Sequence, residues 1–290
     1  MNRIGESELI INGDGSIFHL HIKPEQLADT VILVGDPSRV DTVSSFFQTI
    51  ECSASSREFR SVTGTYNGKR ITVLSTGIGC DNLDIVMTEL DALVNVDFET
   101  RMVKKEHKRL TILRIGSSGA VQSDIPLGSY VFSDVSVGFD GLLNWYADRD
   151  DIVEKELEKD FLEHIDWNKY LPIPYFVKAS QRLSELFEDS TISGMTIAAS
   201  GFYGPQCRVV RIPLAIPDLM EKIESFRSGK YRFTNFEMEG SALAGMARKL
   251  GHDGATVCLI IANRYAKEAN PDYKPLMNNL IKLCLDKLTQ

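Results

Sequence analysis

The sequence predicts a single α/β domain with a twisted, mostly parallel or mixed central sheet flanked by helices. Short β-branched runs alternate along the chain with segments whose apolar residues recur at helical spacing, and this alternation is typical of α/β folds. The 290 residues contain no internal repeat, low-complexity tract or linker rich in proline and serine, so we expect one domain over residues 1–290. A chain of this length can bury enough apolar surface to fold without disulfides or a structural metal.

Six apolar runs rich in β-branched residues are predicted to be strands, with helices between them. The runs cover residues 30–34, 71–76, 110–115, 129–133, 195–200 and 255–262. Asp36 can cap a helix that begins at Pro37, because aspartate is a favourable N-cap and proline suits the first helical turn. Helical stripes also follow Asp81, precede Gly251 and cover 276–288, and we interpret them as core-facing surfaces.

Three segments are expected to lie outside the core. Residues 1–15 are polar and form an N-terminal extension without the apolar centre of a signal peptide. Residues 99–109 carry charges of both signs, and residues 147–160 are dominated by acids. We therefore expect the last two segments to be surface insertions.

Charge and cysteine content narrow the class of protein. The formal net charge of −8 gives no general attraction to nucleic acid or anionic lipid, and the apolar runs are too short to span a membrane. The five cysteines are scattered without a Cys-x-x-Cys pair, and the five histidines show no metal spacing. We therefore expect a cytoplasmic protein with reduced thiols and no cofactor, and neither nucleic acid nor membrane as a partner.

The segment 113–119 combines features that suit an oxyanion. It starts as a buried strand and ends in Gly-Ser-Ser-Gly, whose backbone N–H groups and hydroxyls can approach an anion and donate to it. Arg114 adds a planar, permanently charged guanidinium that matches phosphate. The alternative is a plain strand-to-turn transition with an arginine that points outwards.

A second turn strengthens the anion hypothesis. Residues 35–39 follow the first strand and open a helix, and helix N-termini attract anions, although Asp36 partly opposes this. Both turns would lie at the carboxyl ends of strands, where ligands of α/β sheets bind. The segment 77–82 lacks the third glycine of a dinucleotide fingerprint, and no Walker A sequence occurs, so dinucleotide and nucleoside triphosphate chemistry are not favoured.

Two later segments offer groups for a sugar and for a heterocycle. Glu237 and Glu239 precede a predicted helix and can accept hydrogen bonds from sugar hydroxyls, although acids at a helix start also complement its dipole. A loop further upstream carries the aromatic ring of Phe202, the amide of Gln206 and the guanidinium of Arg208. These three groups suit a planar ring with carbonyl and imide edges.

Taken in order, these segments resemble the nucleoside phosphorylase family, and within it the uridine phosphorylases. The resemblance rests on residues 18–20, 35–39, 56–59, 75–79, 113–119, 202–208, 236–239 and 263–264. Members of this family share a twisted central sheet flanked by helices and form dimers or hexameric rings of dimers. The resemblance therefore implies a homodimer with shared active sites, or a hexamer built from such dimers.

The resemblance also implies a role for each site residue. Phosphate would be held by Gly35, Arg39, Arg114 and Ser117, with Arg57 supplied by a partner subunit. Ribose would be held by Glu237, Met238 and Glu239, with His19 supplied across the same interface. Uracil would be contacted by Phe202, Gln206 and Arg208. Some bacterial members hold a monovalent cation near the position of Glu58. Asn82 replaces their serine here, which argues against this cation, so a monovalent cation near Glu58 is left open and no other metal site is expected.

These roles imply phosphorolysis, in which uridine and inorganic phosphate give uracil and ribose 1-phosphate in pyrimidine salvage or catabolism. The Gln206 and Arg208 pair distinguishes uridine phosphorylases from purine-specific relatives, which place an acidic residue near the position of Asn263 and Arg264. Three alternatives stay open. They are a purine nucleoside phosphorylase, a nucleosidase that uses water, and a non-catalytic nucleoside-binding protein.

Overall fold

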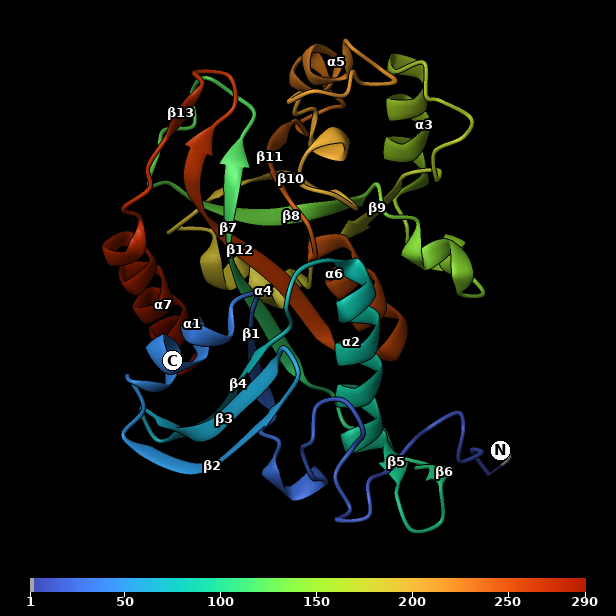
Figure 1. Ribbon diagram of the computed structural model, residues 1–290, viewed down its shortest axis with the longest axis vertical. Coiled ribbons are helices and arrows are strands. Elements are labelled where there is room, and N and C mark those ends of the chain that lie inside the picture. Colours follow the sequence, from blue (N-terminus) through green and yellow to red (C-terminus); the bar gives the residue numbers. More distant parts are fainter. Residues whose placement is uncertain (1–2) are drawn as a thin grey trace.

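The computed structural model describes residues 3–290 and confirms the α/β fold class (Figure 1). Within these residues the chain forms an eleven-stranded mixed sheet, a separate two-stranded hairpin and seven α-helices. The strands are β1 (Thr30–Val34), β2 (Thr49–Ser56), β3 (Phe59–Tyr66), β4 (Lys69–Ser75), β5 (Val96–Asp97), β6 (Met102–Val103), β7 (Thr111–Ala120), β8 (Tyr130–Gly138), β9 (Tyr175–Lys178), β10 (Ile192–Ala198), β11 (Phe233–Glu237), β12 (Asp253–Asn263) and β13 (Glu268–Ala269). The helices are α1 (Pro37–Ser44), α2 (Cys80–Asn95), α3 (Lys155–His164), α4 (Gln181–Phe187), α5 (Leu219–Ser225), α6 (Gly240–Leu250) and α7 (Lys274–Leu288).

The long strand β7 joins two parts of the sheet. The strand order is β13-β12-β8-β10-β11-β7-β1-β4-β3-β2, with β9 paired to β8, and β12 also pairs directly with β7. The strands β7, β12, β8, β10 and β11 therefore form a closed ring, from which β1, β4, β3 and β2 extend as an open sheet. The first half of β7 pairs with β1, whereas Gly119 and Ala120 at its end pair with β11.

Alternation along β1 divides the core between the two faces of the open sheet. Val31 and Leu33 belong to an apolar cluster with α2 and α6, whereas Ile32 and Val34 belong to a second cluster with α1, α4 and α7. Figure 1 shows α2 and α6 on one side of these strands and α1 and α7 on the other. Because helices cover both faces, the strand is apolar throughout rather than alternating.

A third apolar cluster packs α3 and α5 against the ring. Its centre is Phe161, whose ring centroid lies 5.4 Å from those of Phe226 and Phe233. The range 147–160, expected from its acids to be a surface insertion, contains the first part of α3. Most of its acidic residues are exposed, whereas Ile152 and Leu157 are buried against the core.

The range 99–109 anchors the described part of the N-terminal extension. It contains the turn and second strand of the β5–β6 hairpin. Arg101 is buried in this turn and donates to the carbonyl oxygens of Ile4, Gly5 and Leu9. Leu9 in turn packs into the core cluster beside α2. The charged segment and the extension therefore fold together.

The six predicted strands are all present, as β1, β4, β7, β8, β10 and β12, with shifted boundaries. The turn expected at residues 116–119 is wrong, because β7 continues through these residues to Ala120 and they pair with β12. The strands that were not predicted within residues 3–290 are β2, β3, β9 and β11 and the two-residue strands β5, β6 and β13. The many polar residues of β2 and β3 do not give the apolar pattern of a buried strand. For β2 the reason is its place at an edge of the sheet, where its side chains are mostly exposed. Asp36 caps α1 as predicted, whereas α2 begins at Cys80, so that Asp81 lies inside its first turn. Within residues 3–290 no helix is both long and apolar enough to cross a bilayer.

Gly245 allows α6 to pack closely against the 3-10 turn Leu142–Trp145, and we expect Gly245→Ala to destabilise the fold. A Cβ atom at this position would lie 2.4 Å from Cδ1 of Leu143, which is fully buried. The free energy of unfolding should fall by about 1–3 kcal/mol although alanine is the better helix former, because Leu143 has no free space to enter. Denaturant unfolding followed by circular dichroism measures the change.

The control is Gly13→Ala, because a Cβ atom at Gly13 meets nothing within 4 Å. Equal unfolding free energies for the two variants would contradict the packing described for α6.

Candidate active site

A cavity of about 740 Å³ opens where β1, β4, β10 and β11 end and along the second half of β7. Val34, Ser75 and Ile115 are aligned in neighbouring strands, so the segments that follow β1 and β4 lie beside the glycine-serine end of β7. This volume suits a small-molecule ligand. The predicted site residues that line the cavity are Gly35, Arg39, Glu58, Arg114, Ser117, Phe202, Gln206, Arg208, Glu237, Met238 and Glu239.

Two predicted residues, Arg57 and His19, do not line this cavity. Arg57 is exposed in the turn between β2 and β3, with a left-handed backbone φ of 54°. The Nδ1 atom of His19 lies 2.6 Å from the carboxylate of Glu89 in α2, which also accepts the backbone N–H groups of His19 and Leu20. Both side chains are expected to serve a partner subunit, and neither reaches the cavity of its own subunit.

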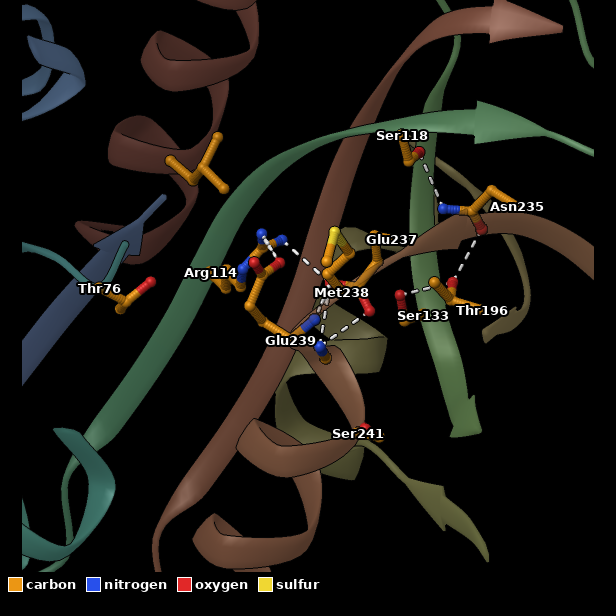
Figure 2. Close-up of polar contacts among 12 residues, drawn as sticks. Thr76, Arg114, Ser118, Ser133, Thr196, Asn235, Glu237, Met238, Glu239 and Ser241 are labelled. Carbon is orange, nitrogen blue, oxygen red and sulfur yellow. Dashed lines mark hydrogen bonds and ion pairs between the residues drawn. The ribbon is translucent and has the colours of Figure 1, made fainter. Parts of the chain in front are cut away.

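Arg114 is buried in the cavity wall and faces two carboxylates (Figure 2). Its neighbours along β7, Leu113 and Ile115, belong to the core cluster on the α7 side of the sheet. Because side chains alternate along a strand, Arg114 points to the opposite face, where β11 ends and α6 begins. Its Nη2 donates to Oε2 of Glu239, and its Nη1 lies 3.2 Å from Oε2 of Glu237. Gly116 leaves room for this arrangement, since a Cβ atom there would lie 2.2 Å from Nη1 of Arg114.

Backbone donors hold the two carboxylates in place. Glu237 accepts the N–H of Glu239 at 2.9 Å and that of Gly240 at 2.8 Å, and Glu239 accepts the N–H of Gly79 at 2.8 Å. Burial raises the pKa of Glu237 to about 7; the charge of Arg114 opposes this shift and that of Glu239 adds to it. One cation and two acids therefore share a site from which water is largely excluded.

Arg39 is the second cation of the cavity wall, and its charge is not neutralised in this way. Its Nη1 donates to the carbonyl oxygen of Ile115 at 3.4 Å, and among residues 3–290 it forms no ion pair. Burial lowers the pKa of Arg39, and the nearby charge of Arg114 acts in the same direction. Because Ser117 lines the same cavity, a guanidinium and a hydroxyl are available to an incoming anion.

The loop after β10 brings an aromatic ring, an amide and a guanidinium into contact with one another. Nη1 of Arg208 donates to the carbonyl oxygen of Phe202 at 2.6 Å and to Oε1 of Gln206 at 2.5 Å. Its guanidinium carbon also lies 3.7 Å from the centre of the Phe202 ring, which is a cation–π contact. Burial lowers the pKa of Arg208 to about 10, so this side chain stays charged at neutral pH.

Arg264 supports this loop from the end of β12. Its Nη1 donates to the carbonyl oxygen of Gln206 at 2.8 Å, and its backbone N–H donates to Ala120 at the end of β7. The sequence analysis named Arg264 only as part of a motif. Its supporting role depends on a contact between segments that lie far apart in the chain.

A buried polar network behind the cavity was not predicted. Ser118 lines the cavity and accepts a hydrogen bond from the side-chain amide of Asn235, as Figure 2 shows. The amide oxygen of Asn235 accepts from Thr196, whose hydroxyl in turn accepts from Ser133. The network crosses β7, β11, β10 and β8, and it holds Ser118 through strands that no local sequence signal connects.

The described residues offer no cluster of protein side chains for a divalent metal. Within residues 3–290 no group of three or more histidine, cysteine, aspartate or glutamate side chains is close enough to hold a metal ion. All five cysteines are free thiols. Glu58 lines the cavity, and a monovalent cation beside it stays a prediction.

The chain is similar to known proteins over most of its length. Residues 29–283 match the family described as the Phosphorylase superfamily. The uridine phosphorylase of Thermococcus kodakarensis is 30% identical over 261 residues, which cover 88% of this chain and 80% of that protein. A DeoD-type purine nucleoside phosphorylase of Bacillus velezensis is 22% identical over 272 residues, which cover 92% of this chain and 97% of that protein.

A solved structure shows the same fold. The crystal structure of a Trypanosoma brucei nucleoside phosphorylase, described as showing uridine phosphorylase activity, superposes with a TM-score of 0.83 and 28% sequence identity. The superposition covers 97% of this chain and 99% of that one. The chain therefore belongs to the Phosphorylase superfamily, and it is an enzyme of the nucleoside phosphorylase type.

Proposed function

We propose that this enzyme is a uridine phosphorylase, which converts uridine and inorganic phosphate to uracil and ribose 1-phosphate. The observation that carries the proposal is the strand order β10-β11-β7-β1. The loop that carries Phe202, Gln206 and Arg208, here called the base loop, follows β10, and Met238 and Glu239 follow β11. Ser117 lies on β7, and Arg39 follows β1. The groups that we assign to base, ribose and phosphate thus line one cavity in this order, which supports the proposal.

The proposed reaction needs charge stabilisation at both ends of the breaking bond. By analogy with glycoside cleavage, the C1′–N1 bond breaks through a state that is positive on the sugar and negative on uracil. A phosphate oxygen then forms the new bond to C1′, and the proton of the phosphate ends on N1 of uracil. Arg208 and Gln206 would stabilise the negative charge on the base, with no covalent intermediate on the enzyme.

The choice of uridine rests on the groups of the base loop. Gln206 offers an amide oxygen and an amide N–H, and Arg208 adds charged N–H donors beside it. An edge with two carbonyls and one imide N–H, as in uracil, matches this set of donors and acceptors. Purine nucleoside phosphorylases also occur among the relatives, so inosine belongs in every assay as the competing substrate.

We also propose that two subunits share each active site. The exposed side chain of Arg57 and the half-buried ring of His19 lie outside the cavity of their own subunit. The exposed apolar residues Ile78 and Phe202 line the same cavity and are 70% and 50% accessible. A partner that covers this rim would bury apolar surface and bring a further arginine towards Arg39.

Uracil release from uridine should depend on added phosphate and should exceed hypoxanthine release from inosine. Chromatography of the released bases with and without phosphate measures both quantities. Release without phosphate would indicate a nucleosidase, and a preference for inosine would indicate a purine enzyme. Binding of uridine without any turnover would contradict catalysis altogether.

Arg208→Ala should reduce kcat/KM for uridine by about 100- to 1000-fold, because it removes a preorganised donor that stabilises charge on the departing base. The matched control is Arg211→Ala, which removes an exposed arginine from the same loop region and should retain activity. Circular dichroism checks that both variants are folded. Near-normal turnover by the Arg208 variant would contradict the base assignment.

Shared sites predict complementation between Arg39→Ala and Arg57→Ala. Each variant alone should be nearly inactive, but co-refolded mixtures should recover about a quarter of wild-type activity, because about half of the dimers are mixed and each mixed dimer has one intact site. A mixture of Arg39→Ala with Arg208→Ala is the control. It should not recover, since both residues act in the cavity of their own subunit. Equal activities of the two mixtures would contradict a shared site.

A further inference from the structure

The charge balance around Arg114 points to a proton that accompanies phosphate. This inference rests on the proposed phosphate site. Arg114 is buried and already contacts both Glu237 and Glu239, so the three side chains carry one excess negative charge when both acids are ionised. Phosphate dianion in the same cavity adds two further negative charges. Like charges that share one cavity repel strongly where water is excluded.

Glu237 is the acid that is placed to remove this repulsion. Its side chain is 1% exposed, and its carboxylate lies 3.2 Å from the Nη1 atom of Arg114, which has no hydrogen-bond partner in the described residues. Both acids accept backbone N–H groups, but Glu239 also accepts a hydrogen bond from Nη2 of Arg114, whereas Glu237 has only the ion-pair contact with Nη1. The looser contact of Arg114 with Glu237 is therefore the one that an incoming phosphate oxygen can replace.

Apart from Arg114 and Glu239, the titratable groups named below that lie near Glu237 are neutral thiols. Arg114 faces it from β7, Glu239 from the start of α6, Cys258 from β12 and Cys80 from α2. Burial raises the pKa of Cys258 to about 12 and that of Cys80 well above its usual value, so both thiols are neutral at physiological pH. Arg114 and Glu239 are therefore the charged groups with the largest effect on Glu237.

We propose that Glu237 takes up one proton from solvent when phosphate binds, so that Arg114 turns from Glu237 to the phosphate while it keeps Glu239. The bound state then contains phosphate dianion, the cations Arg114 and Arg39, one ionised acid and one neutral acid. No bond to carbon or phosphorus changes in this step. Glu237 becomes the residue that couples binding of the nucleophile to pH.

Sulfate is the probe that isolates this proton. Its charge is constant near neutral pH, so a pH dependence of its binding reports protons taken up by the protein and not by the ligand. The burial-raised pKa of Glu237 is about 7, so below this pH the free protein already carries the proton. Above it, the affinity for sulfate should fall by up to about tenfold per pH unit.

Isothermal titration calorimetry in buffers of different ionisation enthalpy counts the protons directly. The proton uptake of the wild-type protein should rise as pH increases past about 7 and approach one proton per sulfate about one pH unit above it. Glu237→Gln should bind sulfate without proton uptake and with an affinity that does not depend on pH. This variant keeps an acceptor oxygen for the N–H of Gly240, so the start of α6 is retained.

The control variant is Asp36→Asn, which removes another acid of the same cavity. Hydrogen bonds from Ser38 hold the pKa of Asp36 below its usual value, so this acid is ionised before and after binding. The variant should therefore retain the proton uptake of the wild-type protein.

Thermal unfolding measured at several pH values checks the fold of Glu237→Gln. The folded state binds a proton at Glu237 more tightly than the unfolded state, whose pKa is 4.5, so this residue makes the wild-type protein less stable as pH rises from 4.5 to about 7. Glu237→Gln should lose this part of the pH dependence.

The outcomes separate the two hypotheses. Failure of both sulfate and phosphate to bind the wild-type protein would contradict the proposed phosphate site. Binding without proton uptake, or proton uptake that persists in Glu237→Gln, would overturn the role of Glu237 while the phosphate site stands. Loss of proton uptake in Asp36→Asn would also overturn it.

Discussion

The buried contact of Arg114 with Glu237 and Glu239 is the interaction on which the geometry of the site depends. Arg114 lies on β7, which belongs to both the closed ring and the open sheet, whereas the two acids bracket the turn from β11 into α6. Breaking a buried pair by removing one partner typically costs about 3–5 kcal/mol, because the other charge stays buried without compensation. The contact therefore fixes β7, which carries part of the proposed phosphate site, relative to the segment that carries Met238 and Glu239.

The two arginines of the cavity, Arg114 and Arg39, differ in their contacts. Arg114 is paired with two acids and connects β7 to the start of α6, whereas Arg39 has no ion pair within residues 3–290 and, in the proposed function, attracts the phosphate. The base loop is organised independently, through the contacts of Arg208 with Phe202 and Gln206 and the support of Arg264. The proposed phosphate and base sites are therefore built from separate contacts within one fold, and the relatives include enzymes named for uridine and for purine nucleosides.

Local physical chemistry explains which parts of the fold the sequence predicted. The apolar strands and capped helices were found because burial on two faces and capping at Asp36 leave clear patterns in neighbouring residues. The strands β2 and β3 were missed because their many polar residues leave no such pattern, although β3 lies inside the sheet and is mostly buried. Ile152 and Leu157 were hidden among acids, although both are buried against the core.

The sequence by itself determined which residue types were available: a guanidinium before a Gly-Ser-Ser-Gly segment, two acids before a helix, and an amide and a guanidinium in one loop. Only the tertiary structure decided how they combine, because Arg114 and Glu239 are 125 positions apart and meet through the pairing of β7 with β11. The same holds for Asn235 and Ser118, which lie 117 positions apart. Such contacts depend on strand register and chain closure, which are properties of the whole chain and not of any local segment.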